Sequence, residues 1–184
     1  MCLRNPGHSI MHQKIPAWFG TIFLIASVAL TEGVHDMATA AAATPISHQD
    51  VERWAAAWNS HDIETVLTLF DPKVVIHQPS NPRPLDFNGA RNFFGMIFKA
   101  YPDFHVALTD AVVEGNTAVS IERVTGTWTG PFVDPGSGKT TPGNGRKFDH
   151  PGVMVLKYGA DRRIQSVDIY WDRVIVNQQL GVSS

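Results

Sequence analysis

The spacing of apolar side chains changes near Pro102, and this change constrains the fold more than any other feature of the sequence. Before Pro102, apolar residues such as Val51, Trp54 and Trp58 recur at the spacing of a buried helical face. After it, four segments rich in β-branched residues are predicted to be strands: 104–113, 117–128, 148–158 and 164–171. Helices followed by a run of strands are typical of an α+β fold.

The helical part is predicted to contain three helices and one strand. Ser47 and Asp50 have the spacing of a capping box, so we expect the first helix to begin there. A second, short helix is expected over residues 63–70, followed by a strand over 73–78. A third helix is expected to begin near Asn88 and to stop at the proline that precedes the strands.

The predicted strands are expected to form a curved antiparallel sheet with the helices on one face. This arrangement leaves a cone-shaped space between the two layers. Turns at 114–116 and 159–161 connect neighbouring strands. Residues 129–146 are rich in Gly, Pro, Thr and Ser and too long for a tight hairpin, which favours a flap over that space.

Residues 1–43 have the order of a secretory signal peptide followed by a cleavage region. Arg4 and Lys14 precede an uncharged apolar stretch at 18–30, and small residues follow it. The pattern predicts a secreted or periplasmic protein without a stable membrane anchor after cleavage. An uncleaved N-terminal anchor is the alternative interpretation.

Start and cleavage sites remain open, but the remainder of the chain, 44–184, is predicted to be a single domain. The start is Met1 or Met11, and the candidate cleavage sites follow Ala29, Ala40 and Ala43. The only cysteine, Cys2, precedes all of them, so the mature chain has no disulfide and no cysteine metal site. A formal net charge of −2 gives no electrostatic footprint for a nucleic-acid partner.

The last predicted strand has two different faces, because side chains alternate along a strand. One face is apolar and contains Val167, Ile169 and Trp171. The other is polar and contains Asp168, Tyr170 and Asp172. The function depends on which of the two faces the interior.

Several short motifs have the order and spacing of one known family: Trp58-Asn59-Ser60-His61-Asp62, Tyr101-Pro102-Asp103, Gly126-Thr127-Trp128-Thr129-Gly130-Pro131, Gly145-Arg146, and Tyr170-Trp171-Asp172 followed by Gln179-Leu180-Gly181. Residues 47–181 thereby resemble the SnoaL-like polyketide cyclases, or ester cyclases, of the nuclear transport factor 2-like (cystatin-like) superfamily. The resemblance implies a cone-shaped α+β barrel with an apolar pocket for a small hydrophobic molecule, often in a homodimer. It also implies intramolecular aldol chemistry without metal or cofactor, with an Asp on the last strand as acid/base and a His as its helper.

The catalytic residues of these families are absent from the matching positions. The cyclase Asp, like that of the limonene epoxide hydrolases, falls at Ile169, and the cyclase His falls at Trp128. Ketosteroid isomerases would place a Tyr at Trp54 and Asp residues at Gln78 and Met154. The chain therefore resembles the scaffold while lacking three known acid/base sets.

Three other ionisable residues are candidates for proton transfer. His77, at the end of the first strand, is either a base at the pocket mouth or a half-exposed residue at a strand end. His150 shares a face with Met154 and is either a pocket base or a rim residue bonded to the flap. Glu122 and Arg123 point to opposite faces of one strand, so an inward Glu122 would become an acid/base candidate.

Asp172 is expected to cap the turn after the last strand, and Asp168 to lie on an outer surface. The histidines lack metal-ligand spacing, which argues against a metal site. The residues expected to bind substrate are Trp54, Trp58, Gln78, Phe94, Trp128, Met154, Ile169 and Trp171.

Three functions are consistent with these features of the sequence. The first is an exported, cofactor-independent enzyme that performs aldol-cyclisation or isomerisation chemistry on a hydrophobic carbonyl compound. The second is a secreted, non-catalytic module that binds a hydrophobic ligand. The third is a dimeric interaction domain whose interior is filled by aromatic side chains. Ionisable groups inside the pocket would favour the first.

Overall fold

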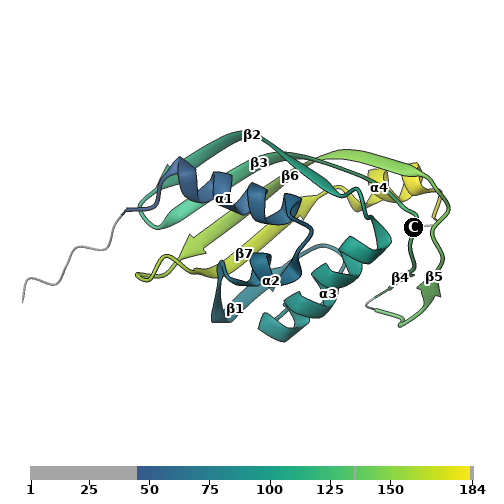
Figure 1. The fold of residues 1–184 in the computed structure, drawn as a ribbon, viewed down its shortest axis with the longest axis horizontal. Coiled ribbons are helices and arrows are strands. Elements are labelled where there is room, and N and C mark those ends of the chain that lie inside the picture. Colours follow the sequence, from purple (N-terminus) through teal and green to yellow (C-terminus); the bar gives the residue numbers. More distant parts are fainter. Residues whose placement is uncertain (1–44, 135, 183–184) are drawn as a thin grey trace, which may run out of the picture. The chain divides into compact units, whose positions relative to one another are not determined.

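The structure is a computed structural model that describes residues 45–134 and 136–182 (Figure 1). The predicted signal segment, its cleavage sites and Cys2 lie outside the described residues. The described residues form four helices: α1 (His48–Asn59), α2 (Ile63–Leu67), α3 (Phe87–Ala100) and α4 (Arg173–Leu180). The strands are β1 (Phe70–His77), β2 (His105–Glu114), β3 (Thr117–Thr127), β4 (Phe132–Val133), β5 (Thr140–Thr141), β6 (Lys147–Tyr158) and β7 (Ile164–Trp171).

Five of the strands form one sheet in the order β1-β7-β6-β3-β2. β1 and β7 are parallel, whereas every other neighbouring pair is antiparallel. The sheet is curved, and α1, α2 and α3 lie along one of its sides (Figure 1). The predicted α+β class with a curved, mainly antiparallel sheet is therefore confirmed.

The core lies between these helices and the sheet. α1 contributes one stripe, in which Val51, Trp54 and Trp58 are buried. β3 and β6 both alternate buried residues with partly or fully exposed ones along their whole length. This alternation gives the sheet an inner face and an outer face, so parity along a strand decides which side chains reach the interior.

The start of α1 follows the predicted capping box. The backbone N–H and the hydroxyl of Ser47 both donate to Asp50 Oδ2, at 2.8 and 3.1 Å. Arg162, in the turn before β7, adds two hydrogen bonds to the same carboxylate, at 2.6 and 2.7 Å. The cap therefore joins the first helix to the last hairpin as well as ending the helix.

Two elements differ from the sequence prediction. The second helix ends at Leu67, and Phe70 begins β1 beside Ile164 of β7. The prediction of a helical Phe70 was therefore wrong, because pairing with the last strand outweighs the local helical spacing. The terminal helix α4 was not predicted, although Asp172 and Gly181 mark its two ends.

The short motifs fasten the helices to the ends of the strands. Asn59, at the end of α1, exchanges two 2.8 Å hydrogen bonds with the backbone of Val106 in β2. Asp103 accepts hydrogen bonds from the backbone and hydroxyl of Thr127, both at 2.6 Å. Beyond β3, an added Cβ on Gly130 would lie 1.9 Å from the carbonyl oxygen of Lys99, so only glycine fits there. These motifs thus hold the rim of the interior.

None of the helices described here is both long and apolar enough to cross a membrane.

Candidate functional site

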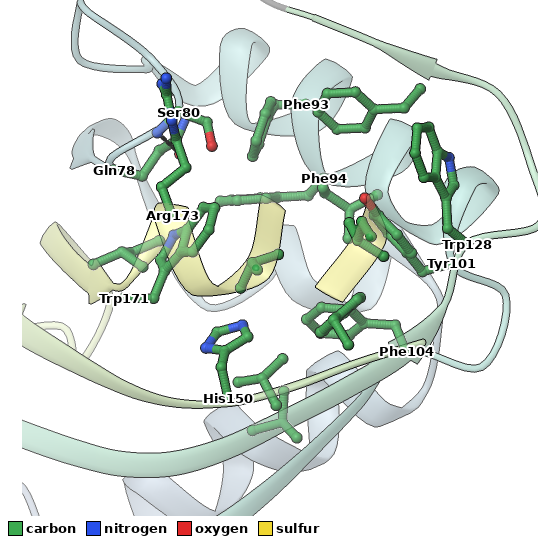
Figure 2. A pocket seen from close by; sticks show the side chains of 18 of the residues that line it. Gln78, Ser80, Phe93, Phe94, Tyr101, Phe104, Trp128, His150, Trp171 and Arg173 are labelled. Atoms are coloured by element: carbon green, nitrogen blue, oxygen red, sulfur yellow. Dashed lines mark hydrogen bonds between the residues drawn. The ribbon is translucent and has the colours of Figure 1, made fainter. Parts of the chain in front are cut away.

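A cavity of about 330 Å³ lies between the inner face of the sheet and the helices (Figure 2). β3, β6 and β7 supply one wall, and α1 and α3 supply another. Phe132 of β4 and Thr141 of β5 also line it, so the segment 129–146 covers the cavity as the flap prediction required. The interior is therefore not filled by its own aromatic side chains. Its size suits a small molecule.

All eight predicted substrate-binding residues line this cavity: Trp54, Trp58, Gln78, Phe94, Trp128, Met154, Ile169 and Trp171. Their role in binding remains a prediction. Trp58 packs edge-on against Trp54 and Phe94, with ring centroids 5.4 and 4.7 Å apart. Such packing fixes the rings, so this wall is an apolar surface formed before any ligand arrives.

Glu122 of β3 points into the cavity and is 2% exposed, whereas Arg123 lies outside and pairs with Asp149 at 2.7 Å. Its Oε1 accepts hydrogen bonds from Trp54 Nε1 at 2.8 Å and from Ser120 Oγ at 2.5 Å. Its Oε2 has no partner among the residues that the structure describes. Burial raises the pKa of Glu122, and these two hydrogen bonds counter that rise. The carboxyl group is thus biased toward the protonated form, and its Oε2 is left without a hydrogen-bond partner among the described residues.

His150 of β6 also lines the cavity and is 8% exposed. Its Nδ1 lies 2.8 Å from the carbonyl oxygen of Pro151, so Nδ1 donates and Nε2 keeps its lone pair. The ring lies between Phe148 and Trp171, at centroid distances of 5.6 and 5.5 Å. Burial lowers the pKa of His150, while the Pro151 hydrogen bond and the charge of Asp149 raise it. The imidazole is therefore biased toward the neutral form, which can accept a proton.

The strand register brings these two groups to one patch of the inner face. β3 and β6 pair Glu122 with Gly152, and Val124 with His150. Glu122 and His150 are therefore diagonal neighbours, with side-chain origins roughly 7 Å apart. Gly152 lies opposite Glu122, and the methyl group of Met154 borders the space above it, 3.2 Å from where a Cβ would stand.

Three further N–H donors on the cavity wall lack acceptors among the described residues: Trp58 Nε1, Gln78 Nε2 and Trp128 Nε1. A buried donor without an acceptor is costly, and a ligand oxygen relieves that cost. The cavity therefore matches a molecule that is mostly apolar but carries oxygen acceptors.

The structure separates His77 from this site. His77 does not line the cavity; its Nδ1 lies 2.9 Å from Asp168 Oδ1 on the outer face, and its side chain is 55% exposed. The hypothesis that His77 is a base at the pocket mouth does not fit this position, because its strand parity turns it outward. Asp172 caps the helix α4 by accepting from the backbone N–H groups of Val174 and Ile175, whereas a capped turn was expected there.

Sequence reasoning missed the part of the cavity wall that α4 supplies: Arg173, Val176, Asn177 and Leu180. A signal for this helix was present in the chain. Asp172 is a favoured N-cap residue, Val176 and Leu180 recur at i and i+4, and Gly181 follows with a left-handed φ of 68°. An added Cβ on Gly181 would also lie 2.3 Å from the Arg146 guanidinium.

Across residues 45–134 and 136–182, no group of three or more His, Asp or Glu side chains is arranged to hold a metal ion.

Comparison with known proteins identifies the scaffold. The model of the SnoaL-like domain family matches residues 51–167. A SnoaL-like polyketide cyclase from Agrobacterium tumefaciens is 20% identical, with a TM-score of 0.57 over 73% of this chain and 97% of that one. IdmH from Streptomyces antibioticus, assigned as a polyketide cyclase, is 25% identical, with a TM-score of 0.59 over 73% and 98%.

A protein from Catenulispora acidiphila with a ketosteroid isomerase-like fold is 18% identical, with a TM-score of 0.61 over 75% of this chain and 96% of that one. The comparison with curated proteins finds no match. Together these comparisons support the nuclear transport factor 2-like architecture that the motifs predicted.

Proposed function

We propose that this chain, which belongs to the SnoaL-like domain family, catalyses proton transfer on a hydrophobic, carbonyl-bearing small molecule. The reaction is of the aldol-cyclisation or isomerisation type and uses no cofactor. One observation carries this proposal: His150 and Glu122 line the same apolar cavity, where burial lowers the pKa of the imidazole and raises the pKa of the carboxyl group. Environments that bias two titratable groups in this way separate a base from an acid.

In the proposed mechanism, His150 Nε2 removes a proton from the carbon next to the substrate carbonyl. The protonated Glu122 Oε2 donates a hydrogen bond to the carbonyl oxygen, where negative charge develops as the enolate forms. In a cyclisation, the enolate carbon attacks a second carbonyl of the same molecule and one C–C bond forms. The imidazolium then returns its proton to the new alkoxide, so the enzyme ends in its starting state.

The binding-module alternative differs in requiring no ionisable group in the cavity. Glu122 and His150 both line it, and both have an atom free for a ligand. A module that only held an apolar molecule would gain from replacing them with apolar side chains, since burying a carboxyl group is costly. These features support an enzyme over a passive carrier.

The test is proton exchange on a bound ketone. We expect wild-type protein to accelerate deuterium incorporation at the α-carbon of 2-tetralone in D₂O, followed by NMR. The double variant Glu122→Gln/His150→Gln is expected to bring the rate to the buffer background while leaving ketone binding measurable by calorimetry. Equal rates for the wild type and the double variant would exclude these residues. Binding without any exchange by the wild type would favour the carrier.

Export and homodimerisation complete the proposal. The signal-like order of residues 1–43 supports export, and mass spectrometry of the periplasmic or secreted protein would identify the mature N-terminus. Val75, Val112 and Tyr170 are exposed apolar residues on the outer side of the sheet, which supports self-association there. Light scattering coupled to size exclusion would measure the mass of the particle.

A further inference from the structure

We propose that Gln78 and Arg173 form a subsite at one end of the cavity that binds a carboxylate group of the substrate. The inference names a chemical class for the molecule and rests on the proposed function only in taking this cavity as the ligand site. Both residues line the cavity, and neither belongs to the proposed proton-transfer pair.

Gln78 is a buried donor directed at the cavity. It is 8% exposed, and its Oε1 accepts a 2.8 Å hydrogen bond from the backbone N–H of Ser80. This bond leaves the Nε2 group for the cavity, where it has no acceptor among the described residues. An oriented and unpaired amide N–H indicates a ligand oxygen at this place.

Arg173 supplies positive charge beside this donor. The backbone N–H groups of Val174 and Ile175, at the start of α4, already bond Asp172, so the charge comes from the guanidinium. No hydrogen bond or ion pair of Arg173 occurs in the described part of the chain. Asp134 also lines the cavity, and its pKa is lowered chiefly by hydrogen bonds from the hydroxyl and backbone N–H of Ser137 to its Oδ1, both at 2.7 Å, and to a smaller extent by the charge of Arg173.

The topology explains why the two residues lie together. β1 and β7 run parallel, with His77 beside Asp168. Both strands therefore leave the sheet at the same end, where Gln78 follows β1 and Arg173 follows β7. Figure 2 draws Gln78, Ser80 and Arg173 on one side of the cavity, and Tyr101 and Trp128 on the other.

A carboxylate fits these donors better than an ester or ketone does. The planar guanidinium can donate to two oxygens at once, and hydrogen bonds between charged groups are stronger than neutral ones. An ester carbonyl offers one acceptor and no charge. The subsite therefore predicts an amphiphilic acid whose apolar body occupies the aromatic wall.

Calorimetric binding of 1-naphthylacetate and of its methyl ester tests the proposal without requiring turnover. We expect the wild type to bind the acid at least about tenfold more tightly than the ester, since charge-assisted bonds distinguish the two. Arg173→Met is expected to remove this preference while leaving ester affinity within about twofold of the wild type. Arg173→Lys should retain part of the preference for the acid over the ester.

Arg163→Met is the matched control, because it changes the net charge by the same amount as Arg173→Met. Arg163 is exposed in the turn before β7 and does not line the cavity. It is expected to leave the acid preference unchanged. The subsite is excluded if the wild type binds acid and ester equally, or if Arg163→Met and Arg173→Met weaken acid binding to the same extent. The assay measures binding alone. The subsite proposal can therefore be contradicted while proton exchange by Glu122 and His150 is still observed, and proton exchange can be absent while the acid preference is still observed.

Discussion

Two pairs of histidine and carboxylic acid lie on neighbouring strands of this sheet, one on each face. On the outer face, His77 and Asp168 bond each other directly at 2.9 Å, and both side chains reach solvent. On the inner face, His150 and Glu122 are buried, and each bonds other partners: His150 bonds Pro151, while Glu122 accepts from Trp54 and Ser120. The residue types are similar, but their surroundings are opposite.

The difference between the outer pair and the inner pair shows where reactivity comes from. In the outer pair, His77 and Asp168 bond each other and contact solvent, so the atoms that bond each other are not available to a substrate. A buried pair held apart keeps one free atom on each member, at Nε2 of His150 and Oε2 of Glu122. Burial raises the pKa of Glu122 and lowers the pKa of His150, so each shift favours the neutral form. A neutral acid and a neutral base are the forms that proton transfer near neutral pH requires.

Substitution of the two histidines should give very different losses of activity. His150→Gln should slow α-proton exchange on 2-tetralone by about a hundredfold or more, because general-base catalysis contributes on that order. His77→Gln should leave the exchange rate within about twofold, since its side chain lies on the other face. NMR exchange rates for both variants under identical conditions make the comparison, and equal losses would contradict the assignment of the inner pair.

The next effect concerns the pH dependence of that exchange. The pKa of His150 is lowered from its ordinary value of 6.5, so the rate should rise with pH in the range below 6.5, where His150 loses its proton. The pKa of Glu122 is raised from its ordinary value of 4.5, so the rate should fall again at the higher pH where Glu122 ionises. Glu122→Gln keeps an N–H donor and should flatten the alkaline side of the profile. A variant with an unchanged alkaline side would show that Glu122 does not act as the acid.

A smaller effect is expected in the pH dependence of thermal stability, through the titration of His150. His150 has a lowered pKa in the folded state, so the unfolded chain binds a proton first as pH falls below 6.5. The wild type should therefore lose thermal stability from pH 7 toward the lowered folded pKa. His150→Gln should lose less over that interval, as measured by calorimetric melting. Equal pH slopes would indicate that folding leaves the pKa of His150 unchanged.

The smallest effect belongs to the outer pair. Asp168→Asn should change the free energy of unfolding by less than about 1 kcal/mol, because solvent-exposed ion pairs contribute little. That change corresponds to a melting-temperature shift of at most about 4 °C for a chain of this size. Denaturant unfolding followed by tryptophan fluorescence would measure it, and a loss of several kcal/mol would show that the outer pair is structural.

Strand and helix periodicity was sufficient to predict most of the framework. The capping box at Ser47 and Asp50, the strand over 164–171 and the apolar face formed by Val167, Ile169 and Trp171 can all be derived from local spacing. These features depend on chemistry repeated every few residues along the chain, which is information that a sequence carries directly.

The face that each ionisable residue occupies follows from how the helices pack on the sheet. Alternation places Glu122 and Arg123 on opposite faces but does not say which face the helices cover. It also cannot tell that His150 meets the aromatic rings of Phe148 and Trp171 while His77 meets Asp168.

The end of the chain shows the same limit. The predicted turn after the last strand became α4, which brings Arg173 to the cavity wall. The spacing of residues along a strand shows which side chains share a face. Which face is buried depends on the elements that pack against the strand. That contact joins residues far apart in the chain, so the assembled fold, and not the sequence pattern, selects the reactive pair.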